Sequence, residues 1–272
     1  GEPHQGLKYM FQMMNEARVG VGFGAAVIGY RGYMHSLEYA KDRLQGRKAS
    51  EKNPDSAQVP IIDHADVRRM LLAQKAYSEG GLALCLYGAR LMDDQHTHPD
   101  EQKRMEAGKL LDLLTPVIKA WPSEYGPKAN DLAIQVYGGA GYTREYPVEQ
   151  CWRDNRLNPI HEGTNGIQAL DLLGRKIWQD QSHGLQLLMQ EMQVDLQAAT
   201  TDRCQQWALS LSETLQQAVK VTQSLGKSLM GGEVDKTLAN ASCYLHLFGH
   251  IIVAWMWLRQ ANASANALAS AN

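Results

Sequence analysis

The sequence predicts an all-α protein, a long antiparallel bundle of the four-helix type followed by an α-helical C-terminal extension. Apolar residues recur at three- and four-residue steps along most of the chain, as in helices that pack on one face. No convincing strand pattern is present, and the 44% apolar content suffices for a packed core. We therefore expect a bundle over 1–179, an extension over 180–262 and a frayed, low-complexity tail over 263–272.

A polar loop separates the first two helices of the bundle. Helical periodicity begins near residue 6 and continues to about residue 46. The segment 46–60 is polar, contains two prolines and shows no periodicity, so it predicts a loop. A second long helix is expected over 63–91, where an apolar stripe contains no proline, and the polar run DDQHTHPDEQ is expected to end it.

Prolines and glycines divide the rest of the bundle. A helix is expected over 101–119, a stop at the Trp–Pro pair 121–122 and a further helix over 126–137, because proline inside a helix removes a hydrogen bond. The glycine-rich stretch 138–166 predicts one long irregular loop, and loops of this length in compact domains are usually functional. Helix is expected again over 166–179.

The extension differs in composition from the bundle. Residues 181–230 are rich in Gln, Leu, Ser and Ala at helical spacing, the MGGE run at 230–233 interrupts them, and a last helix is expected over 234–260. The most apolar segment, 241–261, contains two histidines and a glycine and falls short of the ~20 apolar residues that a bilayer span needs. It predicts a buried helix and no membrane span.

Charge and cysteine content limit the classes of function. The formal net charge of −2 provides no broad basic field for nucleic acid and no polybasic segment for an anionic membrane. Four cysteines are scattered without a CxxC or other metal-ligand spacing, which favours reduced thiols in a cytoplasmic protein. Nucleic-acid binding is therefore not expected.

Two histidine pairs have residue types found in metal sites. His96 and His98 stand near two aspartates, but in a polar stretch without a matched partner, so a solvated turn is favoured. His246 and His250 share a helix face but lack the intervening glutamate of a zinc-protease motif, and core packing is favoured there. We expect no metal site.

The glycine run QVYGGAG at 135–141 allows two interpretations. It lacks the GxGxxG order, and the YTREYP that follows cannot open a helix, so a Rossmann site is not expected. Gly138 and Gly139 either present backbone N–H groups to a phosphate or form a helix C-cap followed by a turn. The residues by themselves favour the C-cap.

The run NPIHEGTNGIQ contains the most informative carboxylate of the chain, Glu162. Asn165 with Gln168 fits a capping box, and Thr164 is the cap if the helix begins one residue earlier. Backbone N–H groups at such a helix start attract an anion. Glu162 either stabilises the helix dipole or acts as a general base with a pKa tuned by a partly apolar pocket, and the residues by themselves favour the first role.

Three blocks in order resemble the C-terminal part of the flavin-dependent acyl-CoA dehydrogenases. They are NEARVGVGFGAAVIGYRGYMHSLEYAKDRLQGR (15–47), AIQVYGGAGYTREYPVEQCWRDNRL (133–157) and NPIHEGTNGIQALDLLGRK (158–176). The resemblance covers 1–179, and the remainder looks like the extra helical domain of the longer branch of this family. It implies that the chain is a fragment without the N-terminal and middle domains, inactive alone and a weak binder of FAD at most.

The resemblance also implies roles for particular residues. Glu162 corresponds to the family's base, which abstracts the α-proton of an acyl-CoA while a hydride leaves the β-carbon for flavin N5. Arg18 and Gly163 would contact the substrate. The FAD would be bound by Arg43, Gln135, Val136, Tyr137, Gly138, Gly139, Thr164, Asn165 and Gly166, with 135–139 serving a neighbouring subunit.

Two positions depart from the family pattern. His161 stands where a tyrosine usually precedes the base, and the Phe–Gly that follows the arginine at position 43 in the family is lost here. The resemblance further implies a homodimer or homotetramer, electron-transfer flavoprotein as electron acceptor and a bacterial cytoplasmic location. Two alternatives stay open: an acyl-CoA oxidase that returns electrons to oxygen, and a non-catalytic oligomerisation or scaffold module.

Overall fold

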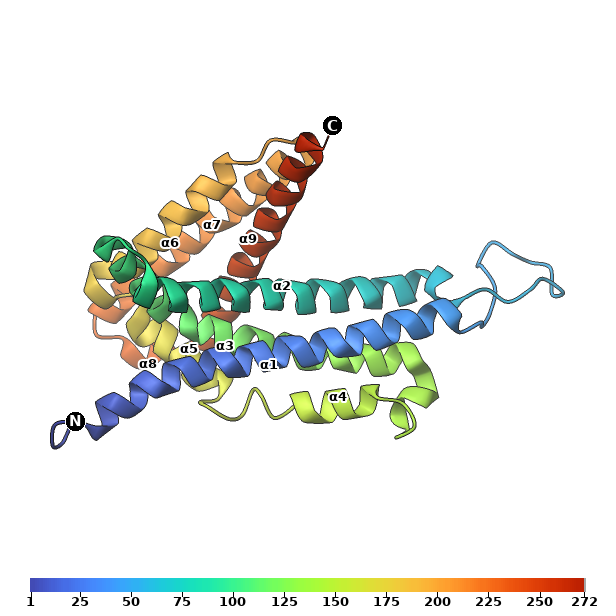
Figure 1. Cartoon of the computed structure of the whole chain (residues 1–272), viewed down its shortest axis with the longest axis horizontal. Coiled ribbons are helices and arrows are strands. Elements are labelled where there is room, and N and C mark those ends of the chain that lie inside the picture. The colour runs from blue at the N-terminus through green and yellow to red at the C-terminus, as the bar shows by residue number, and fades with distance from the viewer. Residues whose placement is uncertain (272) are drawn as a thin grey trace. The chain divides into compact units, whose positions relative to one another are not determined.

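The computed structural model describes residues 1–271, without the side chains at positions 8, 11 and 12. The described residues form helices and no β-strand, which confirms the predicted all-α class (Figure 1). The α-helices are α1 (Gly6–Asp42), α2 (Ala65–Thr97), α3 (Glu101–Tyr137), α4 (Val148–Asn155), α5 (Asn165–Asp171), α6 (Gln179–Gln197), α7 (Asp202–Met230), α8 (Val234–Leu238) and α9 (Ala241–Ser270).

The chain forms two compact units, and the long helices α1, α2 and α3 each contribute to both. The first, here called the site unit, contains residues 1–20, 83–121 and those from 162 onwards. The second, here called the loop unit, contains residues 21–82 and 122–161.

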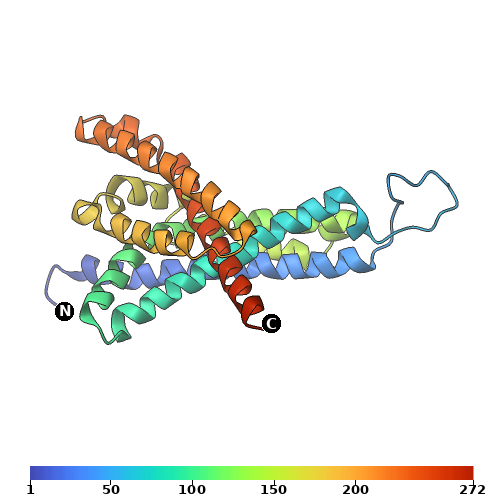
Figure 2. The same cartoon turned by 90° about the horizontal axis from the view of Figure 1, so that it is seen from above.

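The core of the site unit forms where α3 meets the C-terminal helices. Leu114 and Ile118 of α3 are fully buried, as are Leu172 and Trp255. The helices α6, α7 and α9 pack on one another, and Figure 2 shows α9 crossing α7 at an angle (Figures 1 and 2). The mostly apolar centre of this packing follows from the helical periodicity of the sequence.

The loop unit has a small aromatic core. Tyr33, Ile61, Met70 and Val136 are buried together. Beside them the rings of Tyr39 and Tyr137 stack with centroids 4.0 Å apart. The predicted loop is present between α1 and α2, and residues 44 and 60 at its two ends form an isolated β-bridge.

The helix α2 continues past the predicted end at residue 91 to Thr97. An i,i+4 ion pair joins Arg90 and Asp94 at 3.6 Å, and the Thr97 hydroxyl donates to the carbonyl of Asp93 at 2.8 Å. Asp and His therefore do not end this helix. It ends at Thr97, and the next residue, His98, precedes Pro99, whose ring disfavours the helical conformation at that position.

The helix α3 is continuous over Glu101–Tyr137, so the predicted stop at 121–122 is wrong. Three prolines, Pro116, Pro122 and Pro127, lie inside it, although an interior proline costs about 3 kcal/mol. The reason is burial: nearly every side chain over 113–122 lies inside the structure. Packing on all sides offsets the lost hydrogen bonds.

Two further segments differ from expectation. The predicted irregular stretch 138–166 contains a short helix, α4, which Pro147 precedes at a φ of −77°. Proline there fits because the first turn of a helix needs no N–H donor. The single helix expected over 234–260 is wrong: residues 239–240 divide it into α8 and α9, and α9 extends through Ser270, into the segment predicted to fray. The domain boundary near residue 179 stays a prediction.

The helix α9 is long and apolar enough, by length and composition alone, to cross a membrane. In its most apolar 18-residue window, however, 61% of the residues are buried inside the structure. Trp255, for example, is fully buried and donates through its indole N–H to Asp195 at 2.7 Å. This burial is typical of a core helix, as the sequence predicts.

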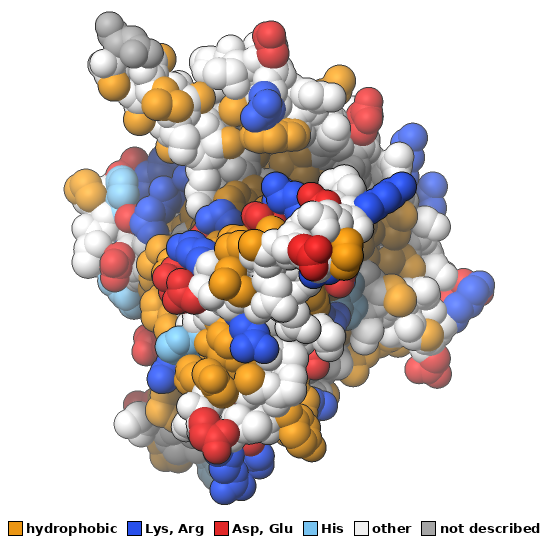
Figure 3. All heavy atoms as spheres, turned by 90° about the vertical axis from the view of Figure 1, so that its right-hand side faces the viewer, with side chains coloured by type: hydrophobic (Ala, Val, Ile, Leu, Met, Phe, Trp, Pro, Cys, Tyr) orange, Lys and Arg blue, Asp and Glu red, His pale blue; other side chains and the backbone are white. Residues whose placement is uncertain are grey.

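On the face shown in Figure 3, Lys and Arg side chains alternate with Asp and Glu side chains, with apolar groups among them. The four cysteines are unpaired; Cys85, Cys151 and Cys204 are buried and Cys243 is exposed. Burial raises the pKa of the Cys85 and Cys151 thiols, so both are protonated near neutral pH.

Candidate active site

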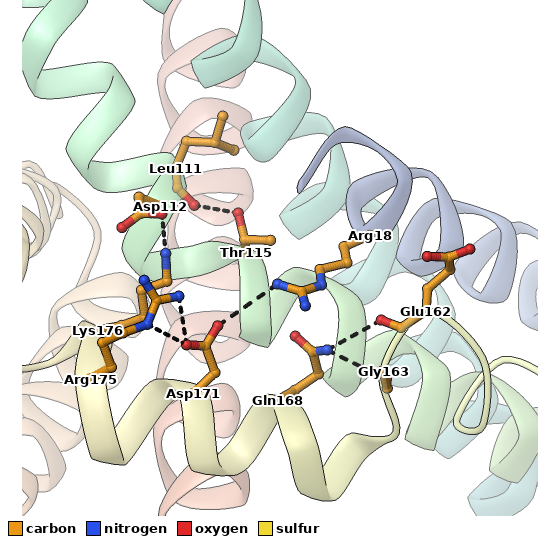
Figure 4. A network of polar contacts seen from close by, with 10 residues as sticks. All are labelled: Arg18, Leu111, Asp112, Thr115, Glu162, Gly163, Gln168, Asp171, Arg175 and Lys176. Atoms are coloured by element: carbon orange, nitrogen blue, oxygen red, sulfur yellow. Dashed lines mark hydrogen bonds and ion pairs between the residues drawn. The ribbon is translucent and has the colours of Figure 1, made fainter. Parts of the chain in front are cut away.

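The helix α5 starts with a capped turn in the site unit. Thr164 is the N-cap, and its side chain accepts a hydrogen bond from the N–H of Ile167 at 3.3 Å. The first helical residue is Asn165, so of the two caps considered from the sequence, Thr164 is the one formed. The fully buried Gln168 reaches back with its amide nitrogen to the carbonyls of Glu162 (3.3 Å) and Gly163 (3.4 Å) (Figure 4).

The backbone at Glu162 is strained. Its φ is 54° and that of the following Gly163 is 85°, so both residues are left-handed. A non-glycine residue costs roughly 1 to 2 kcal/mol in this region. The two bonds from Gln168 hold the turn against that cost. Since strain of this kind clusters at functional sites, it favours a functional role for the half-buried Glu162.

Arg18 of α1 lies beside this turn and is 8% exposed. Its guanidinium pairs with Asp171 of α5 at 3.8 Å (Figure 4). A Cβ built on Gly163 would lie 3.9 Å from Nη2 of Arg18, so the guanidinium borders the turn. The buried Nε of Arg18 has no hydrogen-bond partner in the described structure. Such an unsatisfied buried donor is uncommon in folded proteins.

Lys119 of α3 also lies at this turn and is fully buried. Its ammonium donates to the side-chain oxygen of Asn165 at 3.4 Å, a long contact. Burial lowers the pKa of Lys119 to about 8; the charge of Arg18 adds to this effect and that of Glu162 opposes it. Sequence reasoning missed this residue, although a lone lysine in the apolar run LLTPVIKAW was a usable signal.

A second set of charges continues along α5 and the π-helical turn Leu172–Lys176. Asp171 accepts from Arg175 at 2.8 Å, and the buried Lys176 pairs with Asp112 (Figure 4). A cleft of about 900 Å³ opens beside these charges. Its lining includes Leu7, Asn15, Arg18, Asp112, Ile167, Asp171, Arg175 and Lys176. Arg18 thus connects the cleft with the Glu162 turn.

The other predicted FAD residues belong to the loop unit. Arg43 is exposed just after α1, and Gln135 is exposed on the last turn of α3. The side chains of Val136 and Tyr137 are buried, and the Tyr137 hydroxyl donates to the carbonyl of His35 at 3.1 Å. Neither side chain is therefore open to a ligand.

Gly138 and Gly139 directly follow α3. Gly138 has a φ of 61°, as expected for the C-cap interpretation, and Cβ atoms built at both glycines would meet nothing within 4 Å. The cap and an open backbone therefore coexist, and the phosphate-binding role stays a prediction. The predicted site residues thus form two sets, 162–166 with Arg18 in the site unit and 135–139 with Arg43 in the loop unit.

The histidine pairs examined for metal binding make local bonds. His98 accepts through Nδ1 from the N–H of Asp100 at 3.1 Å, and Nδ1 of His250 lies 2.7 Å from the carbonyl of His246. Across residues 1–271, no group of three His, Cys, Asp or Glu side chains is arranged to hold a metal ion.

Replacing Gly163 with alanine is expected to displace the Glu162 turn. A Cβ at this φ of 85° would lie 2.6 Å from the Gln168 amide nitrogen, which must then release the two carbonyls. We expect a stability loss of about 2 kcal/mol, which thermal melting measures.

The matched control is Gly232→Ala. Gly232 has a φ of 86°, but its Cβ would meet nothing within 4 Å. This variant carries similar backbone strain without the contact, so it is expected to lose only about 1 kcal/mol of stability. Equal stability losses in the two variants would contradict the positioning role of Gln168.

The chain matches two family models. The description "Acyl-CoA dehydrogenase, C-terminal domain" covers residues 4–177, and "Acetyl-CoA dehydrogenase C-terminal like" covers residues 188–272. Among curated relatives, 3-methylmercaptopropionyl-CoA dehydrogenase of Ruegeria pomeroyi is 44% identical over 180 residues, which are 66% of this chain and 30% of that protein. The broad-specificity linear acyl-CoA dehydrogenase FadE5 of Mycobacterium tuberculosis is 34% identical over 98% of this chain and 45% of its own length.

Solved structures share the fold at lower identity. ACDH-11 of Caenorhabditis elegans, in complex with C11-CoA, has a TM-score of 0.80 at 17% identity, covering 96% of this chain and 42% of that one. An acyl-CoA dehydrogenase of Bacillus anthracis complexed with FAD has a TM-score of 0.76 at 22% identity, covering 97% and 45%. The chain thus spans less than half the length of the relatives named here.

Proposed function

Because the chain belongs to the acyl-CoA dehydrogenase family, we propose that the full-length protein oxidises an acyl-CoA thioester to its α,β-unsaturated product with FAD as hydride acceptor. The observation that carries this proposal is the turn at Glu162. A half-buried carboxylate sits there in a strained backbone, beside the buried cations Arg18 and Lys119. These are features of a positioned base rather than of a surface charge.

In this proposal Glu162 takes the α-proton of the substrate. An α-proton next to a thioester carbonyl is weakly acidic, so the base must be a carboxylate shielded from water and within hydrogen-bond reach. Gly163, which carries no side chain, lets the thioester approach the turn closely. Arg18 has an unused buried N–H that would orient the substrate.

The residues of this chain suit FAD as the cofactor. The exposed Arg43 guanidinium would pair with a pyrophosphate, and the open backbone at Gly138 and Gly139 would bind the ADP portion in a neighbouring subunit. The segment 164–166 would contact the flavin side. When bound, FAD accepts the hydride that leaves the β-carbon as the α-proton is removed.

We further propose the partners that this activity requires. The full-length enzyme would contain N-terminal and middle domains, form a homodimer or homotetramer in the bacterial cytoplasm and pass its electrons to electron-transfer flavoprotein. The chain alone would bind FAD weakly and be inactive, because half of the cofactor site would come from those domains.

The test uses the full-length enzyme without oxygen. Acyl-CoA substrates of graded chain length are added and the absorbance of oxidised flavin is followed. We expect rapid bleaching with at least one substrate, then reoxidation by electron-transfer flavoprotein. Reoxidation by oxygen at a comparable rate would instead indicate an oxidase, and no bleaching with any acyl-CoA would overturn the proposal.

A further inference from the structure

We propose that Lys119 is a positioning residue for the base: its buried ammonium group donates to Asn165 at the start of α5 and so fixes the turn 162–165 that carries Glu162. This inference rests on the proposed function, because it assigns Glu162 as the base. Lys119 is buried, donates one hydrogen bond and lies among charged groups.

Lys119 places a charged group inside the core of the site unit. Lys119 is among the largest fully buried side chains of the chain, and an isolated buried ammonium is costly. Lysine is retained here inside an apolar run of α3, where leucine or methionine would pack without that cost. A buried charge of this kind needs partners, and Asn165 is one of them at 3.4 Å.

Asn165 and Glu162 lie on either side of the cap residue Thr164. Asn165 is the first residue of α5 and Glu162 stands two residues before the cap. Gln168 holds the backbone carbonyls of the turn, but the Glu162 side chain projects from it (Figure 4). A cation fixed in the core attracts that carboxylate toward the interior. Lys119 therefore positions the Glu162 side chain, whereas Gln168 positions the backbone carbonyls of the turn.

The charges around Lys119 determine how it titrates. Arg18 of α1 and Glu162 before α5 act on it in opposite directions, and burial is the largest effect. The neighbouring acids Asp171 and Asp112 are paired with arginine and lysine side chains. With a pKa near 8, Lys119 is a cation at neutral pH and becomes neutral as the pH rises further. The turn then no longer has a protonated ammonium group beside it.

The experiment compares three variants of the full-length holoenzyme: Lys119→Gln, Lys119→Arg and the control Lys103→Gln. Lys103 lies on the same helix, exposed and paired with Glu106. We expect Lys119→Gln to lower kcat by about 10- to 100-fold at neutral pH, as for a base displaced by about 1 Å. KM, FAD content and the flavin spectrum are expected to stay close to the wild type, and Lys103→Gln to change none of these.

The pH profile separates positioning from simple structural support. Wild-type kcat is expected to fall as the pH rises through about 8, since only the protonated ammonium holds the turn. Arginine stays protonated in this range, so Lys119→Arg is expected to keep activity above pH 8. If the larger arginine prevents FAD binding, Lys119→Gln decides alone, and its residual activity is expected not to fall through pH 8.

Either of two results would overturn the inference. One is wild-type kcat in Lys119→Gln; the other is a wild-type alkaline fall in every Lys119 variant that binds FAD. Its failure is distinct from failure of the proposed function. An inactive Glu162→Gln enzyme together with a fully active Lys119→Gln enzyme rejects only the role of Lys119, whereas an active Glu162→Gln enzyme rejects Glu162 as the base.

Discussion

Replacing Glu162 with glutamine is expected to slow flavin reduction by acyl-CoA about 10³- to 10⁴-fold in the full-length enzyme, because a general base contributes up to roughly that factor. Glutamine has nearly the same shape but cannot accept the α-proton. The Gln168 bonds go to backbone carbonyls, so the turn itself is expected to persist. Anaerobic stopped-flow absorbance of the flavin gives the rate, and FAD content reports the integrity of the fold.

The matched control is Glu101→Gln, at an exposed glutamate in the first turn of α3. It removes the same charge away from the turn and is expected to leave the rate unchanged. A Glu162→Asp variant tests placement, since it keeps a carboxylate but shortens its reach by one methylene. We expect an intermediate loss there. A Glu162→Gln enzyme that reduced its flavin at the normal rate would reject the assignment of the base.

The second large effect concerns stability. Trp255→Ala is expected to lower the free energy of unfolding by about 3 to 5 kcal/mol, which corresponds to a fall in melting temperature of about 10 °C. Trp255 is fully buried, its ring meets that of Tyr87 with centroids 5.3 Å apart, and Arg259 lies 5.3 Å from its ring centroid. Removal leaves a cavity and takes a hydrogen-bond donor from Asp195.

Trp207→Ala provides the same chemical change at a side chain that is 49% exposed. Its expected cost is about 1 kcal/mol or less. Trp255→Phe keeps most of the ring but loses the N–H, and an intermediate cost of about 1 to 2 kcal/mol is expected. Calorimetry of the purified chain measures all three. Similar melting temperatures for Trp255→Ala and Trp207→Ala would contradict the core position of α9.

Much of the fold could be predicted because helices and loops differ in apolar periodicity and proline content within short segments. The start of α1 at residue 6 and the polar segment 46–60 follow from periodicity and proline content within short windows. The course of α3 could not be predicted in this way. Its prolines signal a break locally, and only the apolar surroundings of residues 113–122 make the continuous helix favourable.

Part of the candidate site could likewise be predicted from the sequence, and part depends on tertiary packing. The sequence by itself determined that a carboxylate precedes a capped helix at 162–165, because caps and turns depend on residues that are adjacent in the chain. Only the tertiary structure decided which distant side chains meet that turn. Arg18 reaches Asp171, and Lys119 reaches Asn165 from a different helix, 46 residues away in sequence. Burial and charge are properties of the packed chain, so the environment of Glu162 exists only once these helices have assembled.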